Sequence, residues 1–381
     1  MIPKSSIYMD YAAATPLDPR VLKSMQPWLT KHYGNPSSIH QFGQTARKAI
    51  DEARLKCLEL LGAFSVHEIV FTGSGTESCN MAIFGAAFAR APKGKHLVVS
   101  ALEHPAVLEP ARYLRDNFGF ELTEVLPNRD GIIELDAIEK ALRPDTILIS
   151  VMLVNNEIGT IQPVAAIAKL ARERGILMHT DACQAPGFVD IRVDTLGVDL
   201  LSLNGSKIYG PKGTGLLYVR EGVQITPLVH GGGQEFRMRG GTENPALIVG
   251  FAKALELVLK DAKKEAARLA KLRDQLQSAL LALPGITLNG SHENRAENNL
   301  NIHVPGHLGE TLVMRLDLDG LAASSGSACS SGKTEPSSVL LALGQSKQEA
   351  LESLRLTLGR FTKPADIKQA LKILKKILLS Q

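Results

Sequence analysis

Cysteines are few in this sequence, and none has a close partner. Cys57, Cys79, Cys183 and Cys329 are scattered along the chain without a C-x-x-C pair. This spacing argues against a structural zinc site and against a disulfide scaffold, because both need cysteines that are close together or numerous. The same pattern favours a reducing compartment. We therefore expect a cytoplasmic protein with no essential metal.

A leader segment, long apolar runs and a large net charge are also lacking. The N-terminus "MIPKSSIYMDYAAATP" has neither the basic segment nor the apolar run of a signal peptide. No stretch approaches the roughly 18 apolar residues that would suggest a membrane span. A net charge of +4 on 381 residues gives no reason to expect nucleic-acid binding, although it is compatible with an acidic protein partner. We expect neither membrane nor nucleic acid as a direct partner.

The composition that is present is that of a globular protein, with 44% hydrophobic and 22% charged residues. Short apolar runs, which predict strands, alternate with amphipathic stretches, which predict helices. Strands are predicted at 68–73, 95–104, 146–157, 176–182, 198–207 and 213–220, and helices at 76–91, 105–118 and 163–175. This alternation predicts an α/β fold with a mostly parallel sheet that helices cover on both faces.

The pattern changes after about residue 244. The amphipathic stretch 247–283 predicts a connecting helix followed by another. A strand at 298–306, a loop around Cys329 and two closing helices around 346–360 and 364–379 then indicate a smaller α+β domain. We expect the N-terminal residues to pack against it. The predicted division is a large domain at 16–258 and a small domain made of 1–15 and 259–381, with the Cys329 loop at about 323–335.

Polar residues follow four of the predicted strands. Thr76, His104, Asn156 and Asp181 each stand just beyond the end of one of these apolar runs. Ligands of parallel sheets bind outside the carboxyl ends of the strands. We therefore expect these side chains to gather at one edge of the sheet and to form a binding site.

Two motifs at this edge suit parts of a phosphorylated cofactor. "TGSGTES" (72–78) offers backbone N–H groups at a helix start and the hydroxyl of Thr76 to a phosphate, unless it is an ordinary capped glycine turn. It lacks the G-K-[ST] ending of a nucleotide P-loop. "HTDACQ" (179–184) places the Asp181 carboxylate at the mouth of a buried strand. A charge there needs a partner, which could be a protonated pyridine nitrogen, a helix end or a basic side chain.

A lysine follows the next strand. "SLNGSKIYGPKG" (202–213) puts Lys207 in a turn of small residues, where an amine can lose its charge and form a Schiff base. A surface lysine is the alternative. A phosphate cradle, a carboxylate and a lysine at one sheet edge together match pyridoxal 5'-phosphate. His104 would then stack on the ring or move protons, or else serve only as a polar residue at a helix entry.

Cys329 has unusual neighbours. It lies in "SSGSACSSGK" (324–333), where small polar residues suit a mobile loop that solvent can reach. A thiolate in such a loop can react and then move. The alternative is a loop cysteine without a task, and composition alone leaves this choice open.

At this point the sequence resembles the cysteine desulfurases of the NifS/IscS type, in the class-V aminotransferase family. The similarity runs nearly end to end and rests on the following motifs, in order: "MDYAAATPLDPRV", "YGNPSSIHQFG", "FTGSGTES", "EHPAVLEP", "VNNEIGTIQP", "HTDACQAPG", "KIYGPKGTG", "HGGGQEFRMRGGTEN", "GSACSS", "EPSSVLLALG" and "LRLTLGRFT". The resemblance implies the type I aminotransferase fold with a seven-stranded sheet. It also implies a homodimer whose active sites are completed across the interface.

The resemblance also implies individual roles. Its catalytic residues are Lys207 as the Schiff-base lysine, His104 stacked on the ring, and Cys329 as the nucleophile that forms a persulfide and could ligate a cluster transiently. Its other cofactor-binding residues are Asp181, Gln184, Thr76, Gly75, Asn156, Ser206, Asn204 and, from the other subunit, Thr242. Its substrate-binding residues are Arg355, which holds the carboxylate, Asn156 and Asn35. Here Asn204 and Ser206 replace the serine and histidine of the family's usual "S-x-H-K".

The implied activity is removal of sulfur from L-cysteine, which yields L-alanine and a persulfide on Cys329. The persulfide would pass to an acceptor protein for iron–sulfur cluster assembly or another thiolation. The spacing from Cys329 to "EPSSVLLALG" resembles the long loop of the group I enzymes. The chain ends at "ILLSQ", without the family's scaffold-docking tail, so the acceptor stays open. A selenocysteine lyase, an aminotransferase of the same fold and a non-catalytic scaffold are the alternatives.

Overall fold

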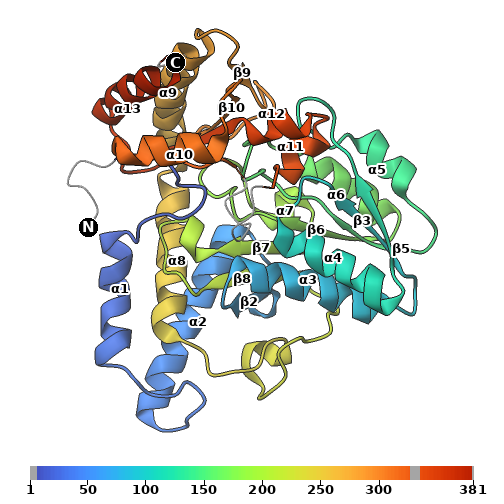
Figure 1. Cartoon of the computed structure of the whole chain (residues 1–381). Coiled ribbons are helices and arrows are strands. Elements are labelled where there is room, and N and C mark those ends of the chain that lie inside the picture. The colour runs from blue at the N-terminus through green and yellow to red at the C-terminus, as the bar shows by residue number, and fades with distance from the viewer. Residues whose placement is uncertain (1–6, 327–334, 380–381) are drawn as a thin grey trace.

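The computed structural model describes residues 7–326 and 335–379 (Figure 1). Its centre is a seven-stranded sheet in the order β2-β8-β7-β6-β5-β3-β4, in which β8 alone runs antiparallel to its neighbours. The strands are β2 (Ile69–Thr72), β3 (His96–Ser100), β4 (Glu121–Val125), β5 (Thr146–Ser150), β6 (Leu177–Asp181), β7 (Leu200–Asn204) and β8 (Gly215–Val219). The predicted α/β class with a mostly parallel sheet is confirmed.

Both faces of this sheet are buried. Successive residues of a strand enter different cores: Val98 belongs to the core that also contains residues of α1, α2, α6 and α8, whereas Leu97 and Val99 belong to the core with α3 and α4. This explains why the strands read as continuous apolar runs. The helices are α1 (Pro19–Thr30), α2 (Gln41–Leu61), α3 (Gly75–Arg90), α4 (Pro105–Phe118), α5 (Leu135–Ala141), α6 (Val164–Glu173), α7 (Val193–Leu196) and α8 (Pro245–Lys260), with short 3-10 turns η1 (Val66–Glu68), η2 (Gly205–Lys207) and η3 (Gln234–Arg237).

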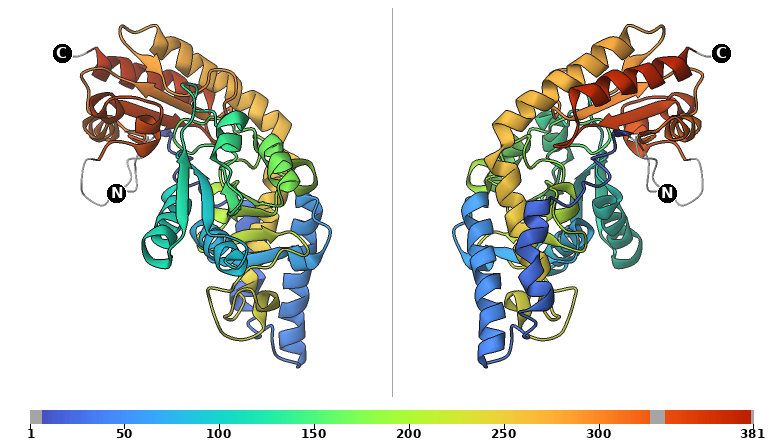
Figure 2. Two further views of the ribbon diagram at one scale, coloured as in Figure 1. Left: turned by 90° about the vertical axis from the view of Figure 1, so that its right-hand side faces the viewer. Right: turned by 90° about the vertical axis from the view of Figure 1, so that its left-hand side faces the viewer.

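A second core lies at the other end of the molecule, where Figure 2 shows the orange and red helices beyond the large sheet. Its antiparallel sheet has the order β12-β10-β9. The elements are β9 (Thr287–Leu288), β10 (Asn299–His303), β12 (Ser353–Thr357), α9 (Ala262–Leu281), α10 (Gly309–Leu318), α11 (Ser338–Ala342), α12 (Lys347–Leu351) and α13 (Pro364–Leu378). The two cores are joined through α8, which packs on the large sheet, and α9, which packs in the second core.

The N-terminal residues belong to this second core. Strand β1 (Ile7–Tyr8) pairs in parallel with β11 (Leu321–Ala322), and Ile7 and Met9 are buried among the leucines of α9 and α13. The exact domain boundaries at 15/16 and 258/259 stay a prediction. Within the described residues, no helix combines the length and apolar character needed to cross a bilayer.

The expected closing helix over 346–360 is wrong. A short helix, α12, ends at Leu351, and the chain then forms β12, which pairs with β10 in the register Arg355 opposite Asn301. In β12 Leu354 and Leu356 enter the second core, and this period of two is that of a strand. The sequence pattern predicts a helix here because Leu351, Leu354 and Leu358 also fit a helical period. Strand β4, at residues 121–125, was not predicted either. It is an edge strand that pairs with β3, and only one of its residues is fully buried.

Candidate active site

Four of the expected residues meet at the carboxyl edge of the large sheet. Asp181 is the last residue of β6, Lys207 closes the turn η2 after β7, His104 caps α4 just beyond β3, and Thr76 lies in the first turn of α3. Parallel strands bring these ends together. The electrostatics agree, because the pKa of His104 responds to the charges of both Asp181 and Lys207.

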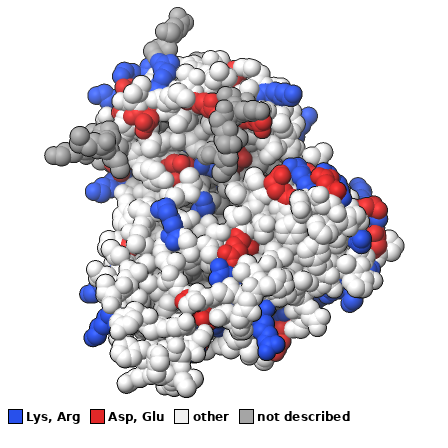
Figure 3. All heavy atoms as spheres, turned by 60° about the horizontal axis from the view of Figure 1, so that its bottom comes forward, with Lys and Arg blue, Asp and Glu red and all other residues white. Residues whose placement is uncertain are grey.

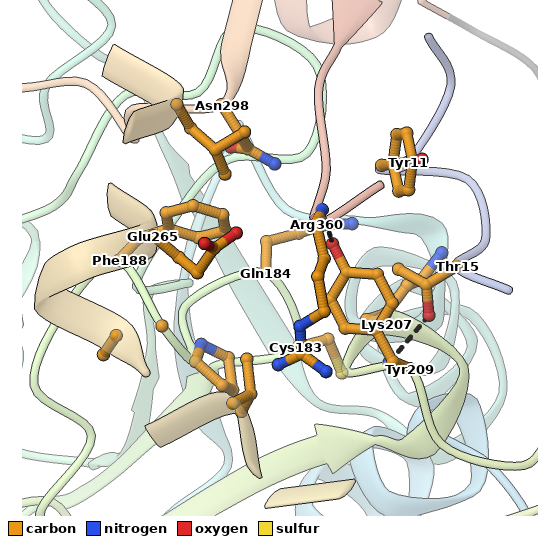
Figure 4. Close-up of a pocket in the computed structure, with 15 residues that line it drawn as sticks. Tyr11, Thr15, Cys183, Gln184, Phe188, Lys207, Tyr209, Glu265, Asn298 and Arg360 are labelled. Carbon is orange, nitrogen blue, oxygen red and sulfur yellow. Dashed lines mark hydrogen bonds between the residues drawn. The ribbon is translucent and has the colours of Figure 1, made fainter. Parts of the chain in front are cut away.

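The Lys207 amine is held by the N-terminal segment. Its Nζ donates to the carbonyl oxygens of Ala12 (2.8 Å) and Ala13 (2.5 Å), and Gln184 Nε2 also donates to the Ala12 oxygen (2.9 Å). Lys207 and Gln184 line a cavity that continues between Tyr209, Glu265 and Arg360 (Figure 4). The side chain of Lys207 therefore faces an internal cavity and not the outer surface.

The turn that carries Lys207 is fixed on both sides. Thr15 Oγ1 donates to the Ser206 carbonyl (2.9 Å) and accepts the Tyr209 N–H (2.8 Å). Tyr209 has φ +62°, a left-handed conformation that is unfavourable outside glycine. Figure 4 shows its ring beside Arg360, whose guanidinium carbon lies 4.6 Å from the ring centre. Neighbouring segments thus hold a strained residue two positions after Lys207, as happens at functional sites.

The Asp181 carboxylate is buried, with 6% of the residue exposed. Its Oδ1 accepts the Cys183 N–H at 2.9 Å. Two residues earlier in β6, His179 is fully buried between Ser150 Oγ (2.8 Å) and Ser202 Oγ (3.0 Å). Burial lowers the pKa of His179 to about 4, so its ring is neutral. A cationic ring nitrogen at the mouth of β6 would compensate the charge of Asp181, and pyridoxal 5'-phosphate has such a nitrogen when protonated.

The start of α3 fits a phosphate. Ser74 caps the helix by accepting the Glu77 N–H (3.1 Å), whereas the N–H groups of Gly75 and Thr76 have no acceptor in the described part of the chain. A Cβ at Gly75 would lie 2.8 Å from Cys183 Sγ and 2.9 Å from Asn204 Cβ. Glycine is therefore required for this helix end to approach the ends of β6 and β7. Open N–H groups at a helix start are a natural phosphate site.

His104 caps α4 through its ring. Nδ1 accepts the Ala106 N–H at 3.0 Å, so the neutral ring carries its proton on Nε2. Burial lowers the pKa of His104, and the Asp181 carboxylate partly offsets this. The residue before it, Glu103, accepts the Met152 N–H (2.5 Å) and so ties the end of β3 to the exit of β5. No local sequence pattern predicts this role of Glu103, because Met152 is 49 residues away.

Asn204 and Ser206 bind each other. Asn204 Oδ1 accepts both the N–H and the hydroxyl of Ser206 (3.1 Å each), which closes the turn before Lys207. The cofactor-binding roles expected for both residues stay a prediction. These contacts show that they also shape the turn.

Arg355 lies in β12 of the small sheet and faces the large sheet's edge. It is 3% exposed. Nη1 donates to the Asn156 carbonyl (3.0 Å) and Nη2 to Asp10 Oδ1 (2.8 Å). Asn156 follows Asn155, whose Oδ1 accepts the N–H groups of Glu157 and Ile158 (2.9 Å each) and so shapes this loop. The sequence analysis did not identify Asp10 as a site residue, because its partner Arg355 is 345 residues away along the chain.

Asn35 and Thr242 lie elsewhere in the chain. Both are exposed, and no hydrogen bond or ion pair within the described residues joins them to Lys207 or Arg355. Each is next in the chain to a residue that Arg47 contacts: Arg47 donates to the Pro36 carbonyl (3.4 Å) and pairs with Glu243 (2.6 Å). The roles expected for Asn35 and Thr242 stay a prediction.

Cys329 lies outside the described residues. The residues that flank this region are held near the site: Ser324 pairs with Arg355, and Ser337 Oγ donates to Glu157 Oε2 (2.5 Å).

The other three cysteines are buried, and burial raises the pKa of each thiol, that of Cys57 to about 12. They are poor nucleophiles for that reason. Among the described residues, no group of His, Cys, Asp and Glu is arranged to hold a metal ion.

Known proteins match almost the whole chain. The cysteine desulfurase IscS of Dictyoglomus turgidum is 48% identical over 376 residues, which cover 98% of this chain and 95% of that protein. Cysteine desulfurase IscS 1 of Archaeoglobus fulgidus is 45% identical over 367 residues, 96% of this chain and 95% of that protein. A solved NifS-like protein superposes with a TM-score of 0.92 at 34% identity, covering 98% of this chain and 99% of that one.

A further solved structure, SspA in complex with cysteine, superposes with a TM-score of 0.82 at 38% identity, over 93% of this chain and 99% of that one. The family model for class-V aminotransferases matches residues 7–370, which include β1, the large sheet and the first turns of α13. This chain therefore belongs to the class-V aminotransferase family.

Proposed function

We propose that this protein is a pyridoxal 5'-phosphate-dependent cysteine desulfurase. One observation carries the proposal: Lys207, Asp181 and His104 lie at one edge of the large sheet. The N-terminal segment connects this edge to Arg355, because it contacts Lys207 through Ala12 and Arg355 through Asp10. The relatives named cysteine desulfurase, and the related structure that holds cysteine, support this substrate. The net reaction converts L-cysteine and an enzyme thiol into L-alanine and an enzyme persulfide.

The residues at the sheet edge fit the cofactor. Lys207 would hold it covalently, Asp181 would pair with the ring nitrogen, and the N–H groups of Gly75 and Thr76 would bind the phosphate. We assign Gln184 to the ring hydroxyl and His104 to the ring face; Gln184 shares the Ala12 carbonyl with Lys207, and His104 caps α4 just beyond β3, which supports this assignment. When bound, the cofactor supplies an electron sink for the bond between the substrate Cα and its hydrogen.

Two side chains are suited to move protons. The Lys207 amine, once displaced by substrate, is the base that we assign to the Cα proton. His104 carries its ring proton on Nε2, because Nδ1 accepts the Ala106 N–H, so Nε2–H is the group that donates toward the substrate. Burial lowers the pKa of His104 and favours the neutral ring, in which Nε2 has no lone pair and acts as a donor.

Arg355 would hold the substrate carboxylate, and Asn156 would line the same place. Cys329 would take the sulfur: its thiolate sulfur bonds to the substrate sulfur, the substrate Cβ–S bond breaks, and a proton on Cβ completes L-alanine. The high pKa values of the buried cysteines leave them unsuited to this step, which supports Cys329 as the acceptor.

A homodimer explains Asn35 and Thr242. Both are exposed at the end of the molecule where the turn between α1 and α2 meets the arm, which we define as residues 230–243. Apolar side chains are exposed there too, with Tyr33 76% and Ile39 92% accessible. Figure 3 shows that much of this end carries no charged side chain. We infer that a second copy covers it, so that Thr242 completes the phosphate site of the partner.

The sulfur acceptor is a second protein, and iron–sulfur assembly or another thiolation is the process that we propose for it. The scattered cysteines support a reducing, cytoplasmic location.

A selenocysteine lyase would use the same residues. Comparing the rate of alanine release from L-cysteine and from L-selenocysteine separates the two activities.

The test of the proposal is a single turnover of the holoprotein with ³⁵S-labelled L-cysteine. The wild type should form L-alanine and retain label that dithiothreitol removes. Cys329→Ala should retain none and form alanine at least about a hundredfold more slowly, because the acceptor thiol is gone. Cys57→Ala, which removes a buried thiol, is the control and should behave as the wild type. Alanine formation by Cys329→Ala at the wild-type rate would refute the role of Cys329.

A further inference from the structure

The segment of residues 9–18 crosses the site from one half of the molecule to the other. At one end it is bound to β12, because the Met9 carbonyl accepts the Thr357 N–H (2.8 Å) and the Ala12 N–H donates to Thr357 Oγ1 (3.0 Å). At the other end Thr15 is bound to the turn of Lys207. Between them the Ala12 carbonyl accepts the Lys207 amine. The segment therefore links the strand of Arg355 to Lys207.

Within this segment Asp10 meets Arg355 directly. Its Oδ1 accepts an N–H of Nη2 at 2.8 Å, while the side chain of Asp10 is 19% and that of Arg355 3% exposed. The backbone of Asp10 is fixed by a bridge to Thr357 and by the Tyr8 hydroxyl, which donates to its carbonyl (2.9 Å). The backbone of Asp10 is therefore held in place on both sides, and its carboxylate binds one end of the Arg355 guanidinium.

Among the described residues, one of the three guanidinium nitrogens of Arg355 has no hydrogen-bond partner. Nη1 is bound to the Asn156 carbonyl and Nη2 to Asp10, but the buried Nε has no hydrogen-bond partner among the described residues. A buried N–H without an acceptor is unfavourable and calls for a ligand. Nε and Nη2 lie on the same edge of the guanidinium plane, and such an edge matches the two oxygens of a carboxylate.

We propose that Asp10 is a positioning residue that orients Arg355, so that the Nε edge receives the α-carboxylate of the substrate. The inference deepens the proposed function and rests on it. Asp10 and Ala12 are two residues apart, a span of at most about 7 Å, so the segment also sets how far the carboxylate site lies from the Lys207 amine. This arrangement selects α-amino acids and treats amines without a carboxylate as poor ligands.

The experiment uses Asp10→Asn in the holoprotein, which keeps the shape of the side chain and removes its charge. Two ligands are titrated by the change in the cofactor absorption: L-alanine, and cysteamine, which is L-cysteine without its carboxylate. We expect the dissociation constant of L-alanine and the KM of L-cysteine to rise about tenfold, because the guanidinium loses a charged partner, whereas the affinity for cysteamine changes less than about twofold. The kcat for L-cysteine should fall less than its KM rises.

Asp116→Asn is the matched control, because Asp116 also pairs with an arginine, Arg115, but on the exposed face of α4. It should leave both affinities unchanged. If Asp10→Asn does not yield folded protein, the affinities for L-alanine and cysteamine are compared in Asp10→Glu instead. This variant keeps the negative charge but displaces it by one methylene.

Equal losses for L-alanine and cysteamine would overturn the proposal, because Asp10 would then support the site as a whole. Unchanged L-alanine affinity in Asp10→Asn, together with a loss of at least about tenfold in Arg355→Gln, would also overturn it and leave the proposed function standing. If the affinity for L-alanine is unchanged in Arg355→Gln as well, Arg355 does not bind the substrate carboxylate. The role assigned to Arg355 in the proposed function would then be wrong.

Discussion

Two histidines near the sheet edge differ in what their rings can do. His179 has both ring nitrogens bound to serine hydroxyls inside the sheet, so it is committed to structure. His104 has one nitrogen bound to the start of α4 and the other available at the site. Burial lowers the pKa of both, but a buried ring in a closed network cannot exchange protons with a substrate. The surroundings of each ring, more than its residue type, decide its role.

His179 should make stability depend on pH. Its pKa is about 4 in the folded protein and 6.5 for a free imidazole, so the unfolded chain binds the proton more tightly and stability is lost as pH falls from 6.5 toward 4. We expect the free energy of unfolding to drop by about 2 kcal/mol more between pH 7 and pH 5 for the wild type than for His179→Gln. Urea unfolding at both pH values measures this. Parallel losses in the two proteins would contradict it.

At the scale of elements, the arm stands out because its backbone is strained. Glu235, Phe236 and Arg237 follow one another with φ of +45°, +57° and +67°. Such a run persists only when its surroundings hold it. Arg54 of α2 does so: its Nη1 and Nη2 donate to the two oxygens of Glu235 (2.7 and 2.8 Å), and its guanidinium lies 4.9 Å from the rings of Phe71 and Phe236.

Breaking this pair should cost much of the stability of the arm. Both side chains are buried, with 4% of Arg54 and 3% of Glu235 exposed. Glu235→Gln leaves the charge of Arg54 without compensation, and we expect a loss of about 3 kcal/mol in the free energy of unfolding. Glu59→Gln, which breaks the exposed pair with Lys56, is the control and should change little. Similar effects of the two variants would show that the Arg54–Glu235 pair does not hold the arm.

For the whole molecule, the proposed dimer predicts which surface two copies share. The turn between α1 and α2 exposes apolar side chains beside the arm, and Arg47 connects the two through Pro36 and Glu243. A surface that exposes apolar side chains next to Thr242, for which we propose a contact with the partner's cofactor, is suited to an interface. In the proposed dimer, assembly and cofactor binding therefore depend on one another.

Charges on this surface should separate the subunits. We expect the wild type to sediment as a dimer at micromolar concentration, and the double variant Ile39→Asp, Phe42→Asp to sediment as a monomer that binds pyridoxal 5'-phosphate at least about tenfold more weakly. Leu318→Asp on α10 alters a side chain that is 87% exposed at the other end of the molecule, and should leave the dimer intact. A wild-type monomer, or a double variant that remains dimeric, would contradict this interface.

The sequence by itself determined the large sheet except for its edge strand β4, and it determined which residues follow the buried strands. Apolar strands that end in Asp181 and just before Lys207 are local patterns, and parallel strands bring their carboxyl ends together without further information. The motifs around them also sufficed to indicate the family. Local patterns, however, did not distinguish a helix from the strand β12, because Leu351, Leu354 and Leu358 fit a helical period whereas Leu354, Leu356 and Leu358 fit a strand, and only the pairing with β10 decides between them.

Only the tertiary structure decided how the two halves meet. Asp10 and Arg355 are 345 residues apart, and neither signals the other in the sequence. The same holds for the Ala12 and Ala13 carbonyls that hold Lys207, and for the pair of Arg54 with Glu235, 181 residues away. Periodicity and turn chemistry report on neighbours along the chain. A carboxylate that orients an arginine, or a carbonyl that holds an amine, depends on positions in space that only the folded chain brings together.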